Sequence, residues 1–223
     1  MTVPGELRVV DDVAAAFVDF VAEAWNARTQ RGFSIALSGG DTARRCYERL
    51  AGAADDPVDW MATEVYWGDE RCVPLDHPDS NYRQAAESLL ENVGGVHALF
   101  PMREDDGDDA YHLLLTSVAA IDVIHLGLGA DGHTASLFPG SPALDADPGR
   151  LVVLNEDPSG RNPHRRMTLT YAGIERGRHV VVTVSGQEKA AAFAAVRRGD
   201  DVPAARLRAE HIVWLVDHAA ASG

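Results

Sequence analysis

Short apolar segments alternate with segments of helical periodicity along almost the whole chain of 223 residues. Strands that are separated by helices are joined by right-handed crossovers, and these give a largely parallel sheet with helices on both faces. The pattern therefore predicts an α/β fold: a three-layer α/β/α arrangement with a Rossmann-like sheet. The expected strands are 7–10, 34–37, 65–67, 121–126, 167–170, 179–184 and 211–216, and the expected helices are 13–25, 41–50, 80–90, 109–120 and 187–196.

The chain is predicted to form a single domain over residues 1–223, because no internal repeat, low-complexity tract or linker interrupts this alternation. Hydrophobic residues make up 46% of the sequence and charged residues 24%, which allows a full core and argues against disorder. Two segments rich in Asp, Gly and Pro, 103–109 and 145–162, are expected to be surface loops, and so is the polar segment after the third strand.

The net charge of −14 argues against nucleic acid or an anionic membrane as the main partner, because both bind clustered Lys and Arg. No apolar run approaches the ~20 residues of a membrane span, and no secretory signal is recognisable. Cys46 and Cys72 show no pairing pattern, which favours a reduced cytoplasmic compartment. An anionic ligand would have to be bound at short range, by backbone N–H groups and a few Arg or Lys side chains.

A glycine pair, Gly39 and Gly40, separates the second expected strand from the helix after it. Glycines let backbone N–H groups approach a ligand, and a helix N-terminus adds unpaired donors and a positive dipole end. Together with the flanking Ser38 and Thr42, these features favour a phosphate-binding cradle. The alternative is an ordinary tight turn in which Asp41 or Thr42 caps the helix.

Charged residues cluster directly after the third expected strand. Asp69, Glu70 and Arg71 lie at the carboxyl end of that strand, where open α/β sheets bind ligands. Ser80 and Asn81 then open the next expected helix and offer further polar groups. We expect Arg71, Ser80 and Asn81 to contact the ligand. Asp69 is expected either to contact it as well or, like Glu70, only to brace the loop; the alternative for the whole segment is an ordinary surface loop.

A glycine-rich turn that carries Asp131 and His133 follows a strand expected to be buried. Residues 127–132 read Gly-x-Gly-x-x-Gly like the dinucleotide fingerprint, but Pro139 ends any helix too early for that motif. An aspartate can orient an imidazole and raise its basicity, and a histidine can deprotonate water near neutral pH. We predict His133 as a general base and Asp131 as its orienting partner; the alternative is that both only shape the turn.

Two further cations are candidates for an anion site. Arg166 lies at the edge of an expected strand and Lys189 in the first turn of an expected helix. Either could meet a phosphate or carboxylate, although each could equally be a surface charge. No metal site and no cofactor are predicted, because the histidines and cysteines show no metal-ligand spacing. His125, inside an apolar strand, is expected to be a hydrogen-bonded core residue.

These stretches together resemble the 6-phosphogluconolactonases of the oxidative pentose phosphate pathway. That family shows Ser-Gly-Gly-Ser-Thr-Pro, then Gly-Asp-Glu-Arg with Val-Pro and Ser-Asn-Tyr, then Gly-x-Gly-x-Asp-Gly-His-Thr-Ala-Ser-Leu-Phe-Pro, and a late Arg-x-Thr-Leu-Thr. Here the counterparts lie at 38–43, 68–71 with 73–74 and 80–82, 127–139, and 166–170. The match runs in order from about Ser34 to Lys189.

The resemblance implies the fold of glucosamine-6-phosphate deaminases, ribose-5-phosphate isomerases and CoA transferases, in a monomer or weak homo-oligomer. It also implies hydrolysis of 6-phospho-D-glucono-1,5-lactone to 6-phosphogluconate. Water activated by His133 would attack the lactone, and Arg71 would stabilise the oxyanion or else bind a substrate hydroxyl. One departure is Asp41, where the family usually has Ser, because a carboxylate there would repel a phosphate unless it points away.

Two other functions stay open. An amino-sugar-phosphate deaminase or isomerase on the same fold would also use a phosphate cradle, but the Thr-Ala-Ser-Leu-Phe-Pro that follows His133 favours the lactonase. A non-catalytic sugar-phosphate sensor would usually carry a DNA-binding segment, for which this acidic chain has no length left.

Overall fold

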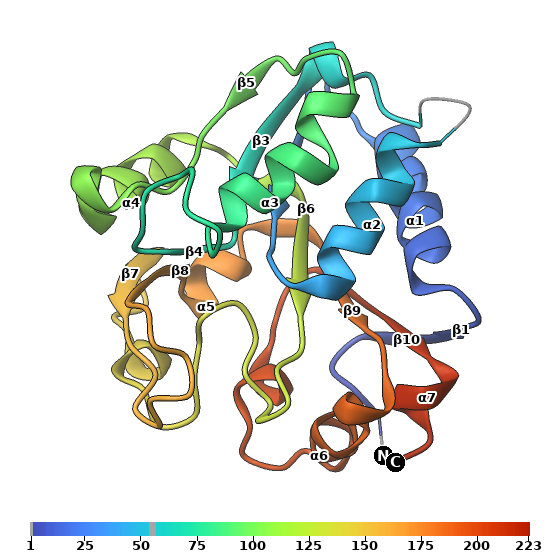
Figure 1. The fold of residues 1–223 in the computed structure, drawn as a ribbon, viewed down its shortest axis with the longest axis vertical. Helices are drawn as coiled ribbons and strands as arrows, with labels where there is room; N and C mark the ends of the chain where they lie inside the picture. The colour runs from blue at the N-terminus through green and yellow to red at the C-terminus, as the bar shows by residue number, and fades with distance from the viewer. Residues whose placement is uncertain (1, 54–56) are drawn as a thin grey trace.

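The computed structural model, which describes residues 2–53 and 57–223, has a seven-stranded sheet at its centre (Figure 1). Its strands are β1 (Glu6–Val10), β2 (Phe33–Leu37), β3 (Thr63–Trp67), β5 (Ala98–Leu99), β6 (Ile121–Gly127), β9 (Gly177–Val184) and β10 (His211–Asp217). They are ordered β1-β10-β9-β6-β2-β3-β5, and every neighbouring pair is parallel. The predicted parallel α/β fold is confirmed.

Helices cover this sheet. They are α1 (Val13–Ala27), α2 (Asp41–Ala51), α3 (Asn81–Ser88), α4 (Gly107–Ser117), α5 (Tyr171–Ile174), α6 (Ala190–Arg198) and α7 (His218–Ala221). Short 3₁₀ turns lie at Trp60–Ala62, Leu90–Asn92, Glu104–Asp106, Pro142–Asp145, Gln187–Lys189 and Pro203–Arg206. Helix α1 contacts β6, β9 and β10, and α2 contacts α1 and α3. The connections from β1 to β5 all run toward the β5 edge of the sheet, and those from β5 to β10 all run back toward the β1 edge. Because the crossovers are right-handed, α4, α5 and α6 lie on the face opposite to α1, α2 and α3.

Side chains cap α1 and α3 at their N-termini. The Asp12 carboxylate accepts hydrogen bonds from the N–H groups of Ala14 and Ala15 at the start of α1. Ser80 Oγ accepts from Arg83 N–H at the start of α3. Such caps satisfy donors that the first helical turn leaves unpaired. Helix α2 differs, because its N-cap is Gly40 and no side chain caps it.

A second, three-stranded antiparallel sheet lies beside the main one, in the order β4-β8-β7 (Figure 1). It is formed by β4 (Asp69–Arg71), β7 (Val152–Asn155) and β8 (Arg166–Leu169). The prediction of a polar loop over 69–71 was therefore wrong, as was the prediction of an unbroken loop over 145–162. The charged run 69–71 has no strand periodicity and is ordered by pairing with β8, which is remote from it in the sequence. The apolar run Leu151–Leu154, by contrast, is a short strand signal that the loop prediction overlooked. The loop expected at 103–109 also ends early, because α4 begins at Gly107.

His125 lies fully buried in β6, as a hydrogen-bonded core residue. Its Nδ1 is 2.9 Å from Tyr47 Oη and its Nε2 is 2.9 Å from Thr183 Oγ1. Burial lowers the pKa of this imidazole from 6.5 to about 3, because the charged form would lose its hydration. Both ring nitrogens are already paired, so His125 supports the core and is not available to a ligand.

We expect His125 to make the fold less stable in mild acid. Its imidazole takes up a proton near pH 6.5 when the chain is unfolded but only near pH 3 when it is folded. The unfolded chain binds the proton first, so stability is lost as the pH falls below about 6.5, by up to about 1.4 kcal/mol per pH unit. The free energy of unfolding of the wild type and of His125→Gln can be measured by urea unfolding at several pH values between 7 and 5. Plotted against pH, it should fall clearly less steeply for the variant.

An equal pH dependence of the free energy of unfolding in the two proteins would contradict the prediction. Should His125→Gln not fold, the imidazole nitrogen shifts of the native wild type at pH 5 provide the same test. They should be those of a neutral ring, and a protonated His125 at that pH would refute the argument. The pKa of His179 is also lowered, by burial first, but His179 is present in both proteins and cancels in the comparison.

Candidate active site

The cleft lies where the connections of the sheet diverge. Strands β2 and β6 are neighbours, but the chain crosses from β2 to β3 on one side and from β6 to β9 on the other. Open α/β sheets bind ligands outside the carboxyl ends of their strands at such a switch point. A cavity of about 340 Å³ opens there, lined by both the Gly39–Gly40 turn after β2 and the Asp131–His133 turn after β6.

Most of the residues predicted to form the site line this cavity. They are Ser38, Gly39, Gly40, Asp69, Arg71, Asn81, Asp131, His133, Arg166 and Lys189. Thr42 and Ser80 do not. The structure thus brings together a candidate base, three cations and a glycine turn from five separate stretches of sequence.

The imidazole of His133 is held by Asp131. His133 Nδ1 is 2.5 Å from Asp131 Oδ1, and the His133 backbone N–H donates to the same oxygen at 3.1 Å. The hydrogen bond from His133 lowers the pKa of the Asp131 carboxyl to about 2, so Asp131 is ionised at neutral pH. With Nδ1 engaged in this way, Nε2 is the ring nitrogen left for a ligand or water. The ring of Phe138 lies edge-on to the imidazole, with centroids 5.0 Å apart.

Two arginines lie side by side on the antiparallel strands. Arg71 in β4 is the direct cross-strand partner of Arg166 in β8. Arg166 is only 6% exposed, and burial lowers the pKa of its guanidinium while the nearby Asp69 opposes that shift. An arginine still keeps its charge in a protein. Among the ion pairs of residues 2–53 and 57–223, none involves Arg71, Arg166 or Lys189, so these cations are available to an anion.

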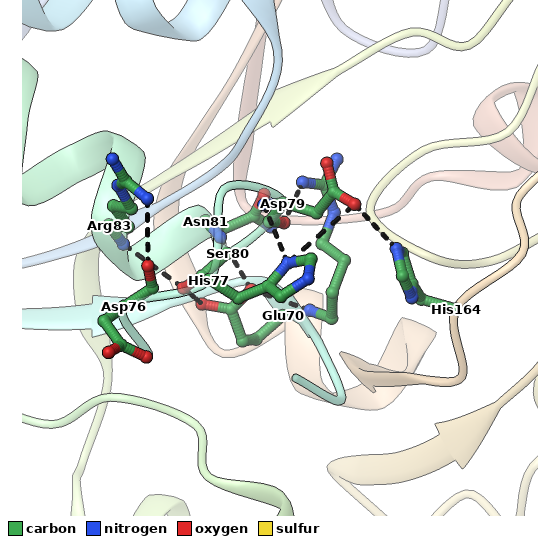
Figure 2. A network of polar contacts seen from close by, with 9 residues as sticks. Glu70, Asp76, His77, Asp79, Ser80, Asn81, Arg83 and His164 are labelled. Carbon is green, nitrogen blue, oxygen red and sulfur yellow. Dashed lines mark hydrogen bonds and ion pairs between the residues drawn. The ribbon is translucent and has the colours of Figure 1, made fainter. Parts of the chain in front are cut away.

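Glu70 ties β4, which ends at Arg71, to the start of α3 (Figure 2). Its carboxylate accepts from the N–H groups of Arg71, Asn81 and Tyr82 at 2.6–2.7 Å and from Ser80 Oγ at 3.0 Å. Burial raises the pKa of Glu70, and the three N–H donors oppose the rise. Ser80 is 1% exposed and is used entirely as a cap and as a donor to Glu70. Its predicted contact with ligand is therefore corrected: Ser80 braces the loop.

Asp69, in β4, is hydrogen-bonded to the loop after β6 and to the start of α3. Its Oδ2 accepts from Ser136 Oγ at 2.6 Å and its Oδ1 from Asn81 Nδ2 at 3.2 Å. Asn81 Nδ2 also donates to the Asp69 backbone oxygen at 2.8 Å. Both hydrogen bonds restrict where the Asp69 carboxylate can turn, so a ligand would meet an already oriented group.

The turn after β2 is shaped by its neighbours on α3. A Cβ on Gly39 would overlap the Asn81 side-chain amide, so only glycine fits there. The N–H of Gly40 donates to Gln84 Oε1 at 3.1 Å, and that amide is already occupied. No acceptor in the described part of the chain pairs with the N–H groups of Gly39 and Thr42. The cradle therefore offers fewer free amides than the sequence alone implied.

Thr42 and Asp41 lie on the far side of this turn. Thr42 lines a second cavity of about 480 Å³, which shares Gly39, Gly40 and Lys189 with the first. Thr42 thus lies outside the lining of the cavity that holds His133 but beside it, and its role in phosphate binding stays a prediction. The Asp41 side chain is 93% exposed and lies 3.6 Å from Arg44, without capping α2. Hydration and the Arg44 cation therefore weaken its repulsion of a nearby anion.

Seven residues of the cavity lining were not predicted as site residues. Five of them belong to the glycine-rich stretch around His133, namely Gly127, Leu128, Gly129, Ala130 and Ala135, and the other two are Arg161 and Asn162. Both belong to the segment 145–162, which was expected to be surface loop. The Asp157 carboxylate folds that loop by accepting from the N–H groups of Ser159 and Asn162 at 2.8 and 3.1 Å. An Asp-Pro-Ser-Gly turn signal followed by a cation was available in the sequence, but not its direction toward the cleft.

Within the described ranges 2–53 and 57–223, no group of three or more His, Cys, Asp or Glu side chains is arranged to hold a metal ion. In the same ranges, no helix combines the length and apolar character needed to cross a membrane.

Comparison with solved structures defines the class of protein. The structure of 6-phosphogluconolactonase from Trypanosoma brucei matches with a TM-score of 0.85 and 29% identity, covering 99% of both chains. That of the enzyme from Trypanosoma cruzi matches with a TM-score of 0.84 and 26% identity, covering 100% of this chain and 98% of the other. A monomeric glucosamine-6-phosphate deaminase matches with a TM-score of 0.80 over 97% of this chain and 99% of the other, but at 18% identity it shows a shared fold only.

Sequence comparison then gives the family. Residues 6–214 match the family described as glucosamine-6-phosphate isomerases/6-phosphogluconolactonase, and the chain belongs to this family. The 6-phosphogluconolactonase of Mycobacterium tuberculosis is 38% identical, covering 94% of this chain and 93% of that protein. The one from Synechocystis is 37% identical, covering 84% and 82%. The family resemblance noted in the sequence is confirmed.

Proposed function

We propose that this protein hydrolyses 6-phospho-D-glucono-1,5-lactone to 6-phosphogluconate, the lactone-opening step of the oxidative pentose phosphate pathway. The single observation that carries the proposal is the shared cavity: the Asp131–His133 pair and the Gly39–Gly40 turn line it together with Arg166. A base and an anion site in one cleft suit a substrate with a reactive ester at one end and a phosphate at the other. The 6-phosphogluconolactonase relatives support the same substrate.

In the proposed mechanism, His133 acts first as a base and then as an acid. Its Nε2 takes a proton from water while the water oxygen forms a bond to C1 of the lactone. Asp131 keeps Nδ1 protonated and stabilises the imidazolium that results. The tetrahedral intermediate then collapses, the bond between C1 and the ring oxygen breaks, and the imidazolium returns its proton to that oxygen. Arg71 stabilises the oxyanion on C1 or, alternatively, binds a substrate hydroxyl.

The phosphate end of the substrate is assigned to the cations and free amides where the two cavities adjoin at Gly39, Gly40 and Lys189. Arg166 supplies a fixed guanidinium, and Lys189, the only lysine in the sequence, supplies a mobile ammonium. The N–H groups of Gly39 and Thr42 supply uncharged donors at the start of α2. Charge-assisted bonds of this kind contribute about 1.5–3 kcal/mol each.

We expect unphosphorylated glucono-1,5-lactone to be a much poorer substrate. Removing the phosphate removes at least two charge-assisted contacts, so kcat/KM should fall about 10²–10⁴-fold. Rapid lactone-opening assays on both compounds, corrected for spontaneous hydrolysis, measure this ratio. Equal values of kcat/KM for the two lactones would remove the phosphate from the proposed binding mode.

The alternative activity within the family is deamination of an amino-sugar phosphate. The glucosamine-6-phosphate deaminase comparison supports it only through the shared fold, at 18% identity. An ammonia assay with glucosamine 6-phosphate, run beside the lactone assay on the same preparation, separates the two activities. Ammonia release without lactone opening would replace the proposed function by this one.

A further inference from the structure

The guanidinium groups of Arg71 and Arg166 carry like charges on neighbouring strands beside the cavity. Arg71 and Arg166 are direct cross-strand partners, and like charges in that position repel one another. Burial first, and then the neighbouring Arg71 cation, lower the pKa of the Arg166 guanidinium, while Asp69 opposes the shift. Something outside the two strands must therefore fix where each guanidinium points.

Each arginine is anchored by one backbone carbonyl. Arg71 Nη1 donates to the carbonyl oxygen of Asp79 at 2.5 Å. Arg166 Nε donates to the carbonyl oxygen of His164 at 3.2 Å. The anchors lie on different loops, one between β4 and α3 and the other between β7 and β8. The position of each guanidinium thus depends on where the loop that supplies its carbonyl acceptor lies.

The side chains of the two anchor residues are joined to each other. His164 Nε2 is 2.8 Å from Asp79 Oδ2, although the residues are 85 positions apart in the sequence. Figure 2 shows the Asp79 carboxylate between His164 and His77. The Asp79 N–H donates to His77 Nδ1 at 3.1 Å, which fixes the backbone of Asp79 as well. The backbone bond from Cys72 N–H to the Arg165 carbonyl oxygen, at 2.8 Å, joins the ends of the same two loops next to the strands. The Asp79–His164 hydrogen bond adds a side-chain link between the two residues whose carbonyl groups anchor the arginines.

We propose that the Asp79–His164 hydrogen bond is a strap that positions Arg71 and Arg166 relative to one another in the substrate cleft. Asp79 and His164 are positioning residues, since they act on substrate only through the arginines. The proposal rests on the proposed function, in which those arginines bind the phosphorylated lactone. It adds the means by which two repelling cations are kept at a fixed separation.

The strap is suited to positioning and contributes little to global stability. The side chains of Asp79 and His164 are 56% and 29% exposed, and exposed pairs of this kind stabilise a fold only weakly. The hydrogen bond from His164 lowers the pKa of Asp79, so the carboxylate is charged at neutral pH. Loss of the strap should therefore raise KM for the substrate and leave Tm nearly unchanged.

The test uses Asp79→Ala, His164→Ala and their double variant, assayed with the phosphorylated lactone. Each single variant should raise KM about three- to tenfold and change kcat by less, with Tm close to that of the wild type. The double variant should be no worse than either single one, because both remove the same bond. Asp79→Asn should restore a KM near the wild-type value, since an amide oxygen still accepts from His164.

The matched control is His218→Ala, which removes another exposed histidine–aspartate pair. His218 Nε2 lies 3.1 Å from Asp11 Oδ1, and neither residue lines the cavity. Its KM should equal that of the wild type. Unchanged KM in both single strap variants, effects that multiply in the double variant, or an equal rise in His218→Ala would each overturn the strap. If the wild type itself does not open the lactone, the proposed function is wrong, and the proposed role of the strap, which depends on that function, is wrong as well.

Discussion

Replacing His133 by asparagine is expected to lower kcat for the phosphorylated lactone by about 10²–10⁴-fold. Asparagine keeps a polar group of moderate size on the turn but cannot take a proton from water. KM should change much less, because in the proposed binding mode Arg166 and Lys189, not His133, hold the phosphate. The measurement is a rapid kinetic assay of lactone opening, with the spontaneous rate subtracted.

The control for this prediction is His97→Asn, a histidine substitution outside the cavity. It should leave kcat unchanged, and the two variants should have similar Tm values. If His133→Asn turns over at nearly the wild-type rate while folded, the general-base role belongs to another group. A Tm collapse in His133→Asn alone would instead point to the structural alternative, in which the residue only shapes its turn.

The positions of the main strands and helices could be predicted because their signals are local. The apolar runs of β2, β6 and β9 and the caps at Asp12 and Ser80 are set by residues close together in the sequence. The glycine turns after β2 and β6 are local signals too, since each directly follows an apolar run. That both turns reach one cleft depends on the strand order, in which β2 and β6 are neighbours, and the sequence predicted no strand order.

What the sequence did not predict depends on contacts between remote segments. Strand β4 consists of the three charged residues 69–71, and no periodicity rule assigns such a run to a strand. It is ordered by pairing with β8 and by the N–H groups that surround Glu70. Likewise, the Gly40 amide is taken by Gln84, 44 residues away, and this could not be read from the glycine pair itself.

A glycine-to-alanine change at Gly129 should inactivate the protein almost as completely as the loss of the imidazole. A Cβ built on Gly129 would overlap Nδ1 and Cε1 of His133 and lie 2.7 Å from its Cγ. The ring must then move away, which breaks its hydrogen bond to Asp131. A misplacement of about 1 Å can cost 10²-fold in rate, so kcat should fall by about that factor or more.

The backbone conformation of Gly129 allows alanine, so an effect of the substitution on kcat can be separated from an effect on folding. Gly129 is not among the glycines with positive φ, so alanine meets no conformational penalty there and Tm should fall only modestly. Gly32→Ala is the matched control: it also has an unstrained backbone, its Cβ would make only an ordinary contact with Ala62 at 3.7 Å, and it does not line the cavity. Its kcat should equal that of the wild type.

A double variant decides how Gly129 acts. If alanine at 129 works only by displacing the imidazole, adding it to His133→Asn removes nothing further, and the double variant should be as slow as His133→Asn alone. Multiplied losses would mean that Gly129 contributes to the cleft independently, for example through its own backbone. Wild-type kcat in Gly129→Ala would show that the imidazole need not occupy the position next to Asp131, and the proposed mechanism would lose its geometric basis.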